Sequence, residues 1–309
     1  MKKPIIIDCD PGLDDAIAIF MIINNSKFDI RAVTPVAGNQ TVDKTSRNAL
    51  NLIDFAGADV PVAIGAAKPL FKKLVTAEHV HGKTGLGDIS LPGSHKEFSE
   101  LNAFEMIHQE AEKFERNLEI VALGPLTNIA VTLLKYPDIK EKIKRITLMG
   151  GSCGCGNDTP AAEFNIYADS DAAKIVFDSG IPITMVGLDV THKALVYEEE
   201  INEISAYKNK ISEVAAKILT NSLKFCRKHG FDGSVMHDPL AMACVIDETV
   251  ISTESLRVDI ETKGILTNGK TVADVFRVTG KKANADVGID INREKFIKIL
   301  KKAMMNYDI

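Results

Sequence analysis

Four aspartates crowd into one short segment, D-C-D-P-G-L-D-D, which runs from Asp8 to Asp15. The apolar run before this segment predicts a strand and the run after it predicts a helix. Ligands of open α/β sheets bind at such turns, outside the carboxyl ends of the strands. Carboxylates this close together repel one another unless a cation joins them, and Ca²⁺ or Mg²⁺ takes carboxylate oxygens readily. The segment therefore predicts a metal-binding or catalytic site.

The last two aspartates of the segment allow a division of roles. On a helix Asp14 and Asp15 lie roughly 100° apart, so we expect that they do not face one ligand atom. One would bind metal, and the other would accept hydrogen bonds from a substrate hydroxyl. The alternative is that both only complement the positive end of the helix dipole, with Gly12 shaping the turn. That alternative explains one or two carboxylates but not four at one strand end.

Polar residues also follow later strands of the predicted sheet. Asn39 comes directly after the second strand and offers a donor and an acceptor, although such a residue is often only part of a turn. In the string A-E-F-N-I-Y-A-D, Glu163 and Asn165 would share one face if the segment is extended, because side chains there alternate. A carboxylate and an amide on one face are suited to holding neighbouring sugar hydroxyls.

Three further stretches carry candidates of lower specificity. The turn after Leu123 could aim a main-chain carbonyl at a metal, or it is a plain strand-to-helix turn. His237 and Asp238 precede a helical run, where Asp238 could bind metal and His237 could donate a proton. His81 begins the glycine-rich string H-G-K-T-G-L-G in a region without secondary-structure pattern. That region is either a lid over a site or an ordinary surface loop.

Short apolar runs that alternate with helical patterns must position these residues. Continuous apolar strands between helices are typical of a parallel sheet covered on both faces. We therefore predict an α/β fold, an open, mostly parallel, doubly wound sheet in one domain over residues 1–309, with late strand and helix additions. The predicted strands are 5–7, 32–36, 60–64, 118–123, 146–149, 183–186, 256–261, 271–277 and 285–291. The predicted helices are 13–23, 43–55, 126–134, 169–177, 198–206, 211–228 and 293–305.

Composition excludes several classes of protein. The chain has 309 residues and a formal net charge of -5, so it lacks the excess of basic residues typical of proteins that bind nucleic acid. Its 45% hydrophobic residues exclude a disordered chain. No apolar run reaches the roughly 18 residues of a membrane span. Five cysteines at irregular positions, with Cys153 and Cys155 as C-x-C, favour free thiols over a zinc site. Together with the lack of a secretory pattern at the N-terminus, this predicts a cytoplasmic protein that binds neither membrane nor nucleic acid.

The motifs in their order resemble the nucleoside hydrolase family, also called the inosine-uridine preferring group. The resemblance covers nearly the whole chain, and the acidic segment is its most specific part. The string from Gly187 to His192 is most similar to the bacterial ribonucleoside hydrolases. The strings that carry the resemblance are D-C-D-P-G-L-D-D-A, A-G-N-Q-T, H-G-K-T-G-L-G, L-G-P-L-T-N, M-G-G, A-E-F-N-I, G-L-D-V-T and M-H-D-P.

The resemblance implies hydrolysis of the N-glycosidic bond of ribonucleosides and a role for each matching residue. The cofactor would be Ca²⁺, and Asp10 would also be the base that deprotonates the metal-bound water. The implied metal ligands are Asp10, Asp15, Asp238 and the main-chain carbonyl of Leu123. The implied substrate-binding residues are Asp14, Asn39, His81, Met149, Glu163, Phe164 and Asn165. His237 would assist departure of the base, and the enzyme would be a homodimer or homotetramer.

The preferred base is open, between pyrimidine-preferring and non-specific. Residues that contact the base vary within the family and come from the region of His81 and from the helix before His237. In this chain that helix offers Phe225, Arg227 and His229. Direct attack by water needs no Ser or Cys nucleophile, and inversion at the anomeric carbon is its expected outcome.

Two other functions share parts of the pattern. A phosphatase of the haloacid dehalogenase type also places D-x-D at the end of a first strand and uses Mg²⁺. The Pro11-Gly12 continuation and the lack of a later acidic G-D-x-x-x-D motif argue against it. A non-catalytic nucleoside or sugar sensor on the same fold would be expected to have lost Asp10 or the other metal-binding carboxylates. All of these carboxylates are present, so we predict the hydrolase.

Overall fold

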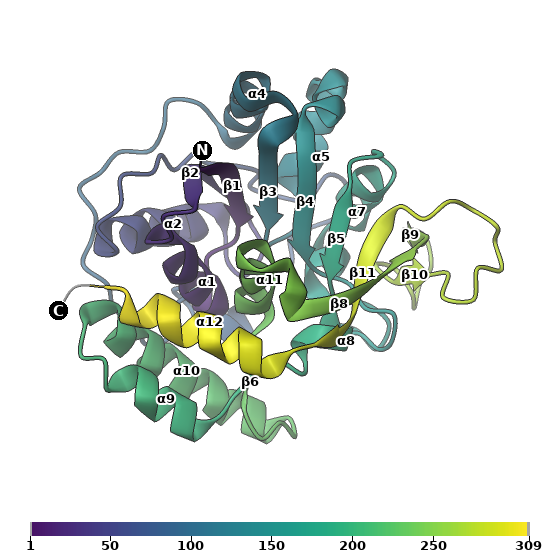
Figure 1. Ribbon diagram of the computed structural model, residues 1–309. Helices are drawn as coiled ribbons and strands as arrows, with labels where there is room; N and C mark the ends of the chain where they lie inside the picture. The colour runs from purple at the N-terminus through teal and green to yellow at the C-terminus, as the bar shows by residue number, and fades with distance from the viewer. Residues whose placement is uncertain (1, 308–309) are drawn as a thin grey trace.

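A mostly parallel sheet forms the centre of the computed structural model, which describes residues 2–307 (Figure 1). Within these residues seven strands lie in the order β2-β1-β3-β4-β5-β11-β8, and only β8 runs antiparallel, to β11. The strands are β1 (Lys3–Cys9), β2 (Phe28–Pro35), β3 (Leu118–Ala122), β4 (Ile143–Met149), β5 (Ile183–Val186), β8 (Ile251–Leu256) and β11 (Ala285–Ile291). The predicted doubly wound α/β fold is confirmed.

Two apolar layers cover the two faces of the sheet. One layer contains helices α1 (Leu13–Ile23), α2 (Val42–Phe55), α9 (Glu198–Ser205), α10 (Lys210–Lys228), α11 (His237–Ile246) and α12 (Arg293–Met305). The other contains α4 (Ala103–Phe114), α5 (Thr127–Lys135) and α7 (Ser170–Phe177). Because both faces are covered, the central strands β1, β3, β4 and β5 are mostly buried, which is why they appear in the sequence as short apolar runs. The edge strand β8 is more exposed and carries polar residues.

Smaller elements lie around this core. Short helices are α3 (Glu78–His81), α6 (Phe164–Ala168) and α8 (Leu188–Thr191), and single 3-10 turns span Glu115–Asn117, Pro137–Glu141 and Glu248–Val250. Two short antiparallel pairs complete the fold: β6 (Leu195–Val196) with β7 (Ser234–Val235), and β9 (Val258–Ile260) with β10 (Thr271–Ala273). The β9–β10 pair projects from the β8–β11 edge of the sheet (Figure 1). None of the described helices combines the length and apolar character needed to cross a membrane.

The strand order creates a switch point at β1. Strand β1 pairs with β2 on one side and with β3 on the other, so the chain leaves the carboxyl end of β1 between two diverging connections. Ligands of open α/β sheets bind in such a crevice. The acidic segment occupies this place, between β1 and α1.

Several predicted elements differ from the structure. Residues 60–64 form no strand; Val62 makes a single parallel bridge to Val33, since Pro61 has no N–H for a longer ladder. The predicted strand 256–261 is split between β8 and β9, and 271–277 is a strand only as far as Ala273. Helix α4 had no counterpart in the prediction. Gly230, two residues after the end of α10, adopts the left-handed conformation common after a helix, with φ 85°.

Candidate active site

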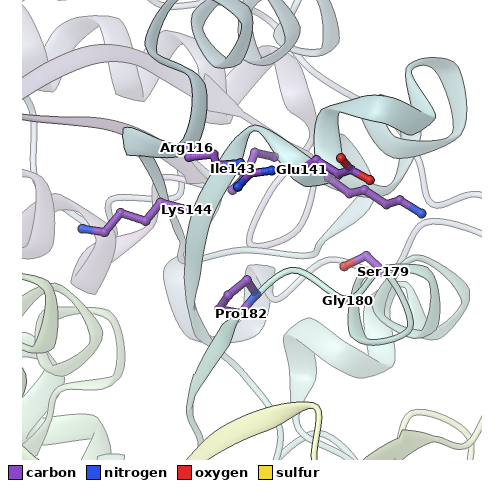
Figure 2. Close-up of a pocket in the computed structure, with 8 residues that line it drawn as sticks. Arg116, Glu141, Ile143, Lys144, Ser179, Gly180 and Pro182 are labelled. Carbon is purple, nitrogen blue, oxygen red and sulfur yellow. The ribbon is translucent and has the colours of Figure 1, made fainter.

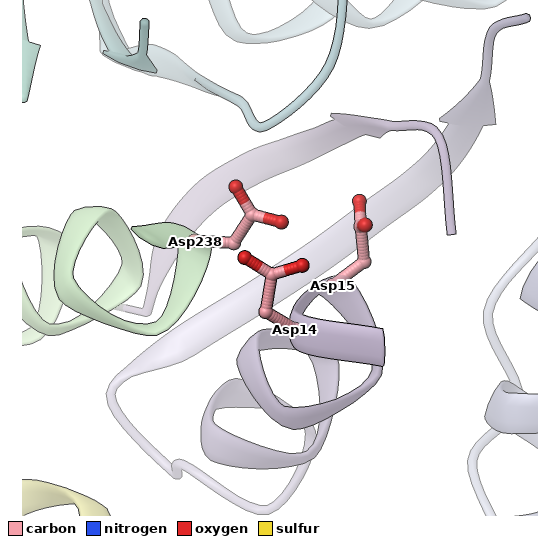
Figure 3. Close-up of side chains that lie close together, drawn as sticks. All are labelled: Asp14, Asp15 and Asp238. Atoms are coloured by element: carbon pink, nitrogen blue, oxygen red, sulfur yellow. The ribbon is translucent and has the colours of Figure 1, made fainter. Parts of the chain in front are cut away.

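Three carboxylates from two helices converge at the carboxyl end of β1. Asp14 and Asp15 come from the first turn of α1, and Asp238 comes from the first turn of α11 (Figure 3). One oxygen of each lies within 4.8 Å of the others. The expectation that Asp14 and Asp15 cannot face one ligand atom is therefore wrong, because two side chains can converge from positions 100° apart on a helix. Among residues 2–307, this group alone combines His, Cys, Asp or Glu side chains at metal-binding spacing.

Asp10 lies beside this group and is fully buried. Its Oδ2 accepts the main-chain N–H of Asn39 at 2.6 Å, whereas its Oδ1 has no hydrogen-bond partner among the described residues. The carboxylate is tightly enclosed, since a Cβ on Gly124 would lie 2.5 Å from Oδ1 and one on Gly38 would overlap Oδ2. A buried carboxylate oxygen without a partner is costly, so this atom needs a ligand that the protein does not supply.

Burial and mutual repulsion raise the pKa of the carboxyls of Asp10, Asp15 and Asp238. Burial is the main cause for each, and it raises the pKa of Asp15 to about 7. Repulsion from Asp15 adds to the raised pKa of Asp10, and repulsion from Asp14 adds to that of Asp238. A divalent cation would remove this repulsion, and hard cations prefer oxygen ligands. The donor set and the unpartnered oxygen of Asp10 therefore fit a divalent metal.

The side chain of Asn39 forms hydrogen bonds to the acidic segment. Its side-chain amide donates to the main-chain carbonyl of Asp10 at 3.1 Å and to Oδ2 of Asp15 at 3.0 Å. Asp15 in turn accepts main-chain N–H groups of Asp10 and Gly12, at 3.2 and 2.8 Å. The end of β2 is thus tied to the end of β1 by the side chain of Asn39.

Glu163 and Asn165 lie in a helical turn and not in an extended segment. Glu163 is the N-cap residue of α6, and its carboxylate accepts the main-chain N–H groups of Gly151, Asn165 and Ile166 at 3.0, 2.9 and 3.1 Å. Their predicted shared face on a strand is therefore wrong, because the carboxylate at residue 163 starts a helix by satisfying its free N–H groups. Phe164 is the first helical residue and donates its N–H to Asn157 at 3.0 Å.

The side chain of Asn165 joins two neighbouring strand ends. Its amide donates to the carbonyl of Leu123, after β3, at 2.7 Å and to the carbonyl of Met149, the last residue of β4, at 3.1 Å. Both Glu163 and Asn165 are buried. The structure thus gathers the residues predicted for ribose binding at adjacent strand ends, although by a local geometry that differs from the predicted one.

Two histidines flank the acidic cluster. His81, the last residue of α3, accepts the main-chain N–H of Leu13 on its Nδ1 at 3.1 Å. His237 lies 2.8 Å from the hydroxyl of Thr191 through its Nδ1, and the edge of its ring meets His192 with centroids 5.8 Å apart. Burial lowers the pKa of both His81 and His237. No role was predicted for Thr191 or His192, although both belong to the family-like string beginning at Gly187.

The segment after His81 is anchored from α2. Three side chains spaced four residues apart donate to its main-chain carbonyls: Gln40 to Gly82 at 2.9 Å, Lys44 to Lys83 at 2.6 Å and Asn48 to Thr84 at 2.9 Å. Asn48 also donates to the carbonyl of Pro11 in the acidic segment at 3.0 Å. We call these three side chains the α2 ladder; Lys44 and Asn48 belong to α2, and Gln40 directly precedes its N-cap residue, Thr41. Their four-residue spacing is visible in the sequence, but their backbone partners are not.

Helix α10 offers fewer contacts to the site than the sequence suggested. Arg227 is exposed and pairs with Glu198 at 2.8 Å. His229 is exposed, its ring packs on Phe225 with centroids 4.4 Å apart, and its Nδ1 lies 3.0 Å from the carbonyl of Phe225. The aromatic residue that reaches the histidines is Phe231, whose ring centroid is 5.2 Å from that of His192.

A hollow lies at the opposite end of the sheet from the acidic cluster. It is lined by residues near the start of β4 and before β5, among them Lys144, Ser179 and Pro182 (Figure 2). None of the residues predicted for catalysis, metal or substrate lines it. The carboxyl ends of the strands therefore remain the candidate active site.

The fold and the site together define an α/β protein with an acidic centre suited to a divalent cation. Residues 5–298 match the family model of the inosine-uridine preferring nucleoside hydrolases. The chain belongs to this family.

Relatives of known sequence and structure agree with this assignment. Pyrimidine-specific ribonucleoside hydrolases RihA of Salmonella arizonae and Shewanella woodyi are 43% and 45% identical to this chain. The alignments cover 99% of this chain and 100% and 99% of the relatives. A plant nucleoside hydrolase superposes with a TM-score of 0.94 at 30% identity, covering 99% of this chain and 100% of that one. The purine-preferring ribonucleoside hydrolase of Gardnerella vaginalis superposes with a TM-score of 0.92 at 30% identity, over 98% of this chain and 99% of that one.

Proposed function

We propose that the chain binds Ca²⁺ at its acidic cluster and uses Asp10 as the base in hydrolysing pyrimidine ribonucleosides. Membership of the family makes it an enzyme that cleaves the N-glycosidic bond of ribonucleosides to ribose and free base. The observation that carries the proposal is the buried carboxylate of Asp10, with one unpartnered oxygen, beside the converging carboxylates of Asp15 and Asp238.

The metal would be held by Asp10, Asp15, Asp238 and the main-chain carbonyl of Leu123. When bound, the cation lowers the pKa of water and offers a fixed attachment point for hydroxyl groups. The carbonyl of Leu123 already accepts one N–H from Asn165, and a carbonyl has a second lone pair for a further ligand. A set made only of oxygen atoms is the reason for proposing Ca²⁺ over a softer metal.

The chain's own residues would position the sugar and receive a proton. The free Oδ1 of Asp10 accepts the proton of the attacking water, and the enclosed position of the carboxylate between Gly38 and Gly124 fixes the direction of attack. Direct displacement gives inversion at the anomeric carbon. The ribose would be held by Asp14, Asn39, Glu163, Asn165 and the main chain at Met149, with Phe164 in the same turn.

The base would lie on the side of His81 and His237. Preference for a pyrimidine is supported by the relatives at 43% and 45% identity, which are named pyrimidine-specific, whereas the purine-preferring neighbour is only 30% identical. A single domain, a homodimeric or homotetrameric assembly and a cytoplasmic location are the remaining parts of this proposal. Limited proteolysis, light scattering and cell fractionation would test them in turn.

A panel of nucleosides tests the function directly. Uridine, cytidine, inosine and adenosine are incubated with the Ca²⁺-loaded enzyme, and free ribose is measured as reducing sugar. We expect kcat/KM for uridine and cytidine to exceed that for either purine nucleoside. A purine nucleoside as the best substrate would overturn the pyrimidine preference, and absence of ribose with all four would overturn the proposed activity.

A further inference from the structure

The imidazole of His237 is held from one side by a single hydroxyl. Thr191 is the last residue of α8, is fully buried, and places its Oγ1 2.8 Å from Nδ1 of His237. In the described part of the chain, this is the one hydrogen bond that the hydroxyl makes. The two residues are 46 positions apart, so the contact depends on how α8 and α11 pack.

The direction of this hydrogen bond follows from burial. If Thr191 accepted a proton from Nδ1, its own hydroxyl hydrogen would be buried without a partner, which costs about 1–3 kcal/mol. If Thr191 donates, its hydrogen is satisfied and Nδ1 is the acceptor. A neutral imidazole then carries its proton on Nε2. The favoured arrangement is therefore a donating hydroxyl and an Nε2–H group on His237.

His81 reaches the same tautomer by a separate contact. The main-chain N–H of Leu13 can only donate, so Nδ1 of His81, 3.1 Å away, is an acceptor. The proton of a neutral His81 is consequently on Nε2. Both histidines beside the acidic cluster thus have Nδ1 engaged by a donor of the protein, and both keep an Nε2–H group for a ligand.

We propose that Thr191 is a positioning residue that orients His237 and keeps its proton on Nε2 for the departing base. This inference rests on the proposed function. When the bond between the anomeric carbon and the base nitrogen breaks, its electron pair leaves with the base, and water adds to the anomeric carbon while its proton passes to Asp10. The Nε2–H group of His237 donates a hydrogen bond to the base, which stabilises the negative charge until solvent protonates it.

Two substrates whose leaving groups differ in stability distinguish the positioning role of Thr191 from a purely structural role. Thr191→Val removes the hydroxyl but keeps the shape, and Thr191→Ser keeps the hydroxyl. Uridine has a poor leaving group, whereas 4-nitrophenyl β-D-ribofuranoside releases a stable phenolate that needs no donor. We expect Thr191→Val to lower kcat for uridine at least tenfold, with KM within about twofold, and to leave kcat for the nitrophenyl riboside within about twofold. Thr191→Ser restores most of the activity on uridine.

A matched control is Thr132→Val. Thr132 is also buried, but its hydroxyl donates to the carbonyl of Asn128 within α5, so the substitution removes a buried hydroxyl away from His237. We expect it to leave the ratio of the two activities unchanged. Equal losses of Thr191→Val on both substrates, no loss on uridine, or a serine variant as poor as the valine variant would each overturn the proposal.

A spectroscopic measurement decides the tautomer without any activity. Two-bond ¹H–¹⁵N correlations of the Ca²⁺-loaded protein, labelled with [¹⁵N]histidine, distinguish protonated from bare ring nitrogens, and His237→Gln identifies the signals. We expect Nε2–H for His237 in the parent and in Thr191→Ser, and loss of this single form in Thr191→Val. A proton on Nδ1 in the parent would overturn the inference, even if the protein hydrolysed no nucleoside.

Discussion

Asn165 donates its side-chain N–H to the main-chain carbonyl of Leu123 at 2.7 Å, which joins a proposed ribose-binding residue to a proposed metal ligand. The same amide reaches the carbonyl of Met149, so one side chain fixes the ends of two neighbouring strands. We therefore expect the proposed metal and sugar sites to be coupled, because a change at Asn165 would remove the donor that fixes the carbonyl of Leu123.

Replacing Asn165 by Leu tests this connection. The variant leaves two buried carbonyls without their donor, so we expect a loss of about 1–3 kcal/mol in unfolding free energy, together with weaker Ca²⁺ binding and a higher KM. Calorimetric titration of Ca²⁺ and chemical denaturation measure the two effects. Asn202→Leu, at an exposed position of α9, is the control. Unchanged Ca²⁺ affinity in Asn165→Leu would show that the two groups act separately.

Asp10→Asn removes the proposed base with little change in shape. The amide oxygen can still accept the N–H of Asn39, whereas the NH₂ group takes the place of the unpartnered Oδ1. At saturating Ca²⁺ we expect kcat to fall by at least about 10²–10⁴-fold, the typical contribution of a general base, while the protein still folds. Asp59→Asn, at an exposed side chain, serves as the control. Turnover within tenfold of the parent would contradict the assignment.

Removal of the metal should destabilise the protein. Without a cation the buried carboxylates of Asp10, Asp15 and Asp238 repel one another, and a ligand that binds only the folded state adds about 2.7 kcal/mol at 100 times its Kd. We expect a chelator to lower the melting temperature and added Ca²⁺ to restore it, with a much smaller shift in Asp238→Asn. Elemental analysis of undialysed protein measures the bound ion. Full activity in chelator, with no stoichiometric divalent ion in the protein, would contradict the proposed metal site.

Glu163 should make substrate binding and stability respond to pH in opposite directions. Burial raises the pKa of its carboxyl from 4.5 to about 7, against the three N–H groups that lower it. Because the folded state holds this proton more tightly than the unfolded state, the residue's contribution to stability is lost as pH rises from about 4.5 to about 7. Above that range the carboxylate is ionised and accepts ribose hydroxyls more strongly, so KM for uridine should fall.

The matched variant for this prediction is Glu163→Gln, whose amide does not titrate. Denaturation and initial rates are measured from pH 5 to 8 at saturating Ca²⁺. We expect the pH dependence of KM near pH 7 to flatten in the variant. We also expect the variant to lose the contribution of Glu163 to the pH dependence of the unfolding free energy, which is on the order of 3 kcal/mol. Parent and variant with identical pH profiles of KM would rule out Glu163 as the titrating group.

Where the local sequence pattern is strong, the first and last residues of a helix or strand could be predicted. Helices α1 and α12 and strands β5 and β11 have the predicted bounds, since each is a continuous apolar or amphipathic run flanked by turn-forming or capping residues. Pro61 shows where such reasoning fails, because an apolar run can lie beside a sheet without the N–H groups to join it.

The same distinction applies to the residues of the candidate site: positions that depend on the local pattern could be predicted, and positions that depend on packing could not. The placing of Asp10, Asn39 and Leu123 at strand ends follows from the order of strands and helices. The convergence of Asp14 with Asp238 depends on the packing of α1 against α11, which the sequence does not encode locally. The helical turn at Glu163 was missed because alternation over three residues cannot distinguish a strand from a capped helix.

The α2 ladder has a consequence for how this enzyme can diversify. Its three side chains hold the 82–84 segment by main-chain carbonyls, and every residue type has such a carbonyl. The side chains of Lys83 and Thr84 can therefore be exchanged while the anchorage stays intact, whereas position 82 favours glycine because its φ is 73°. If the base lies beside His81 as proposed, we expect substitutions in this segment to change the preferred base while the proposed catalytic residues stay in place.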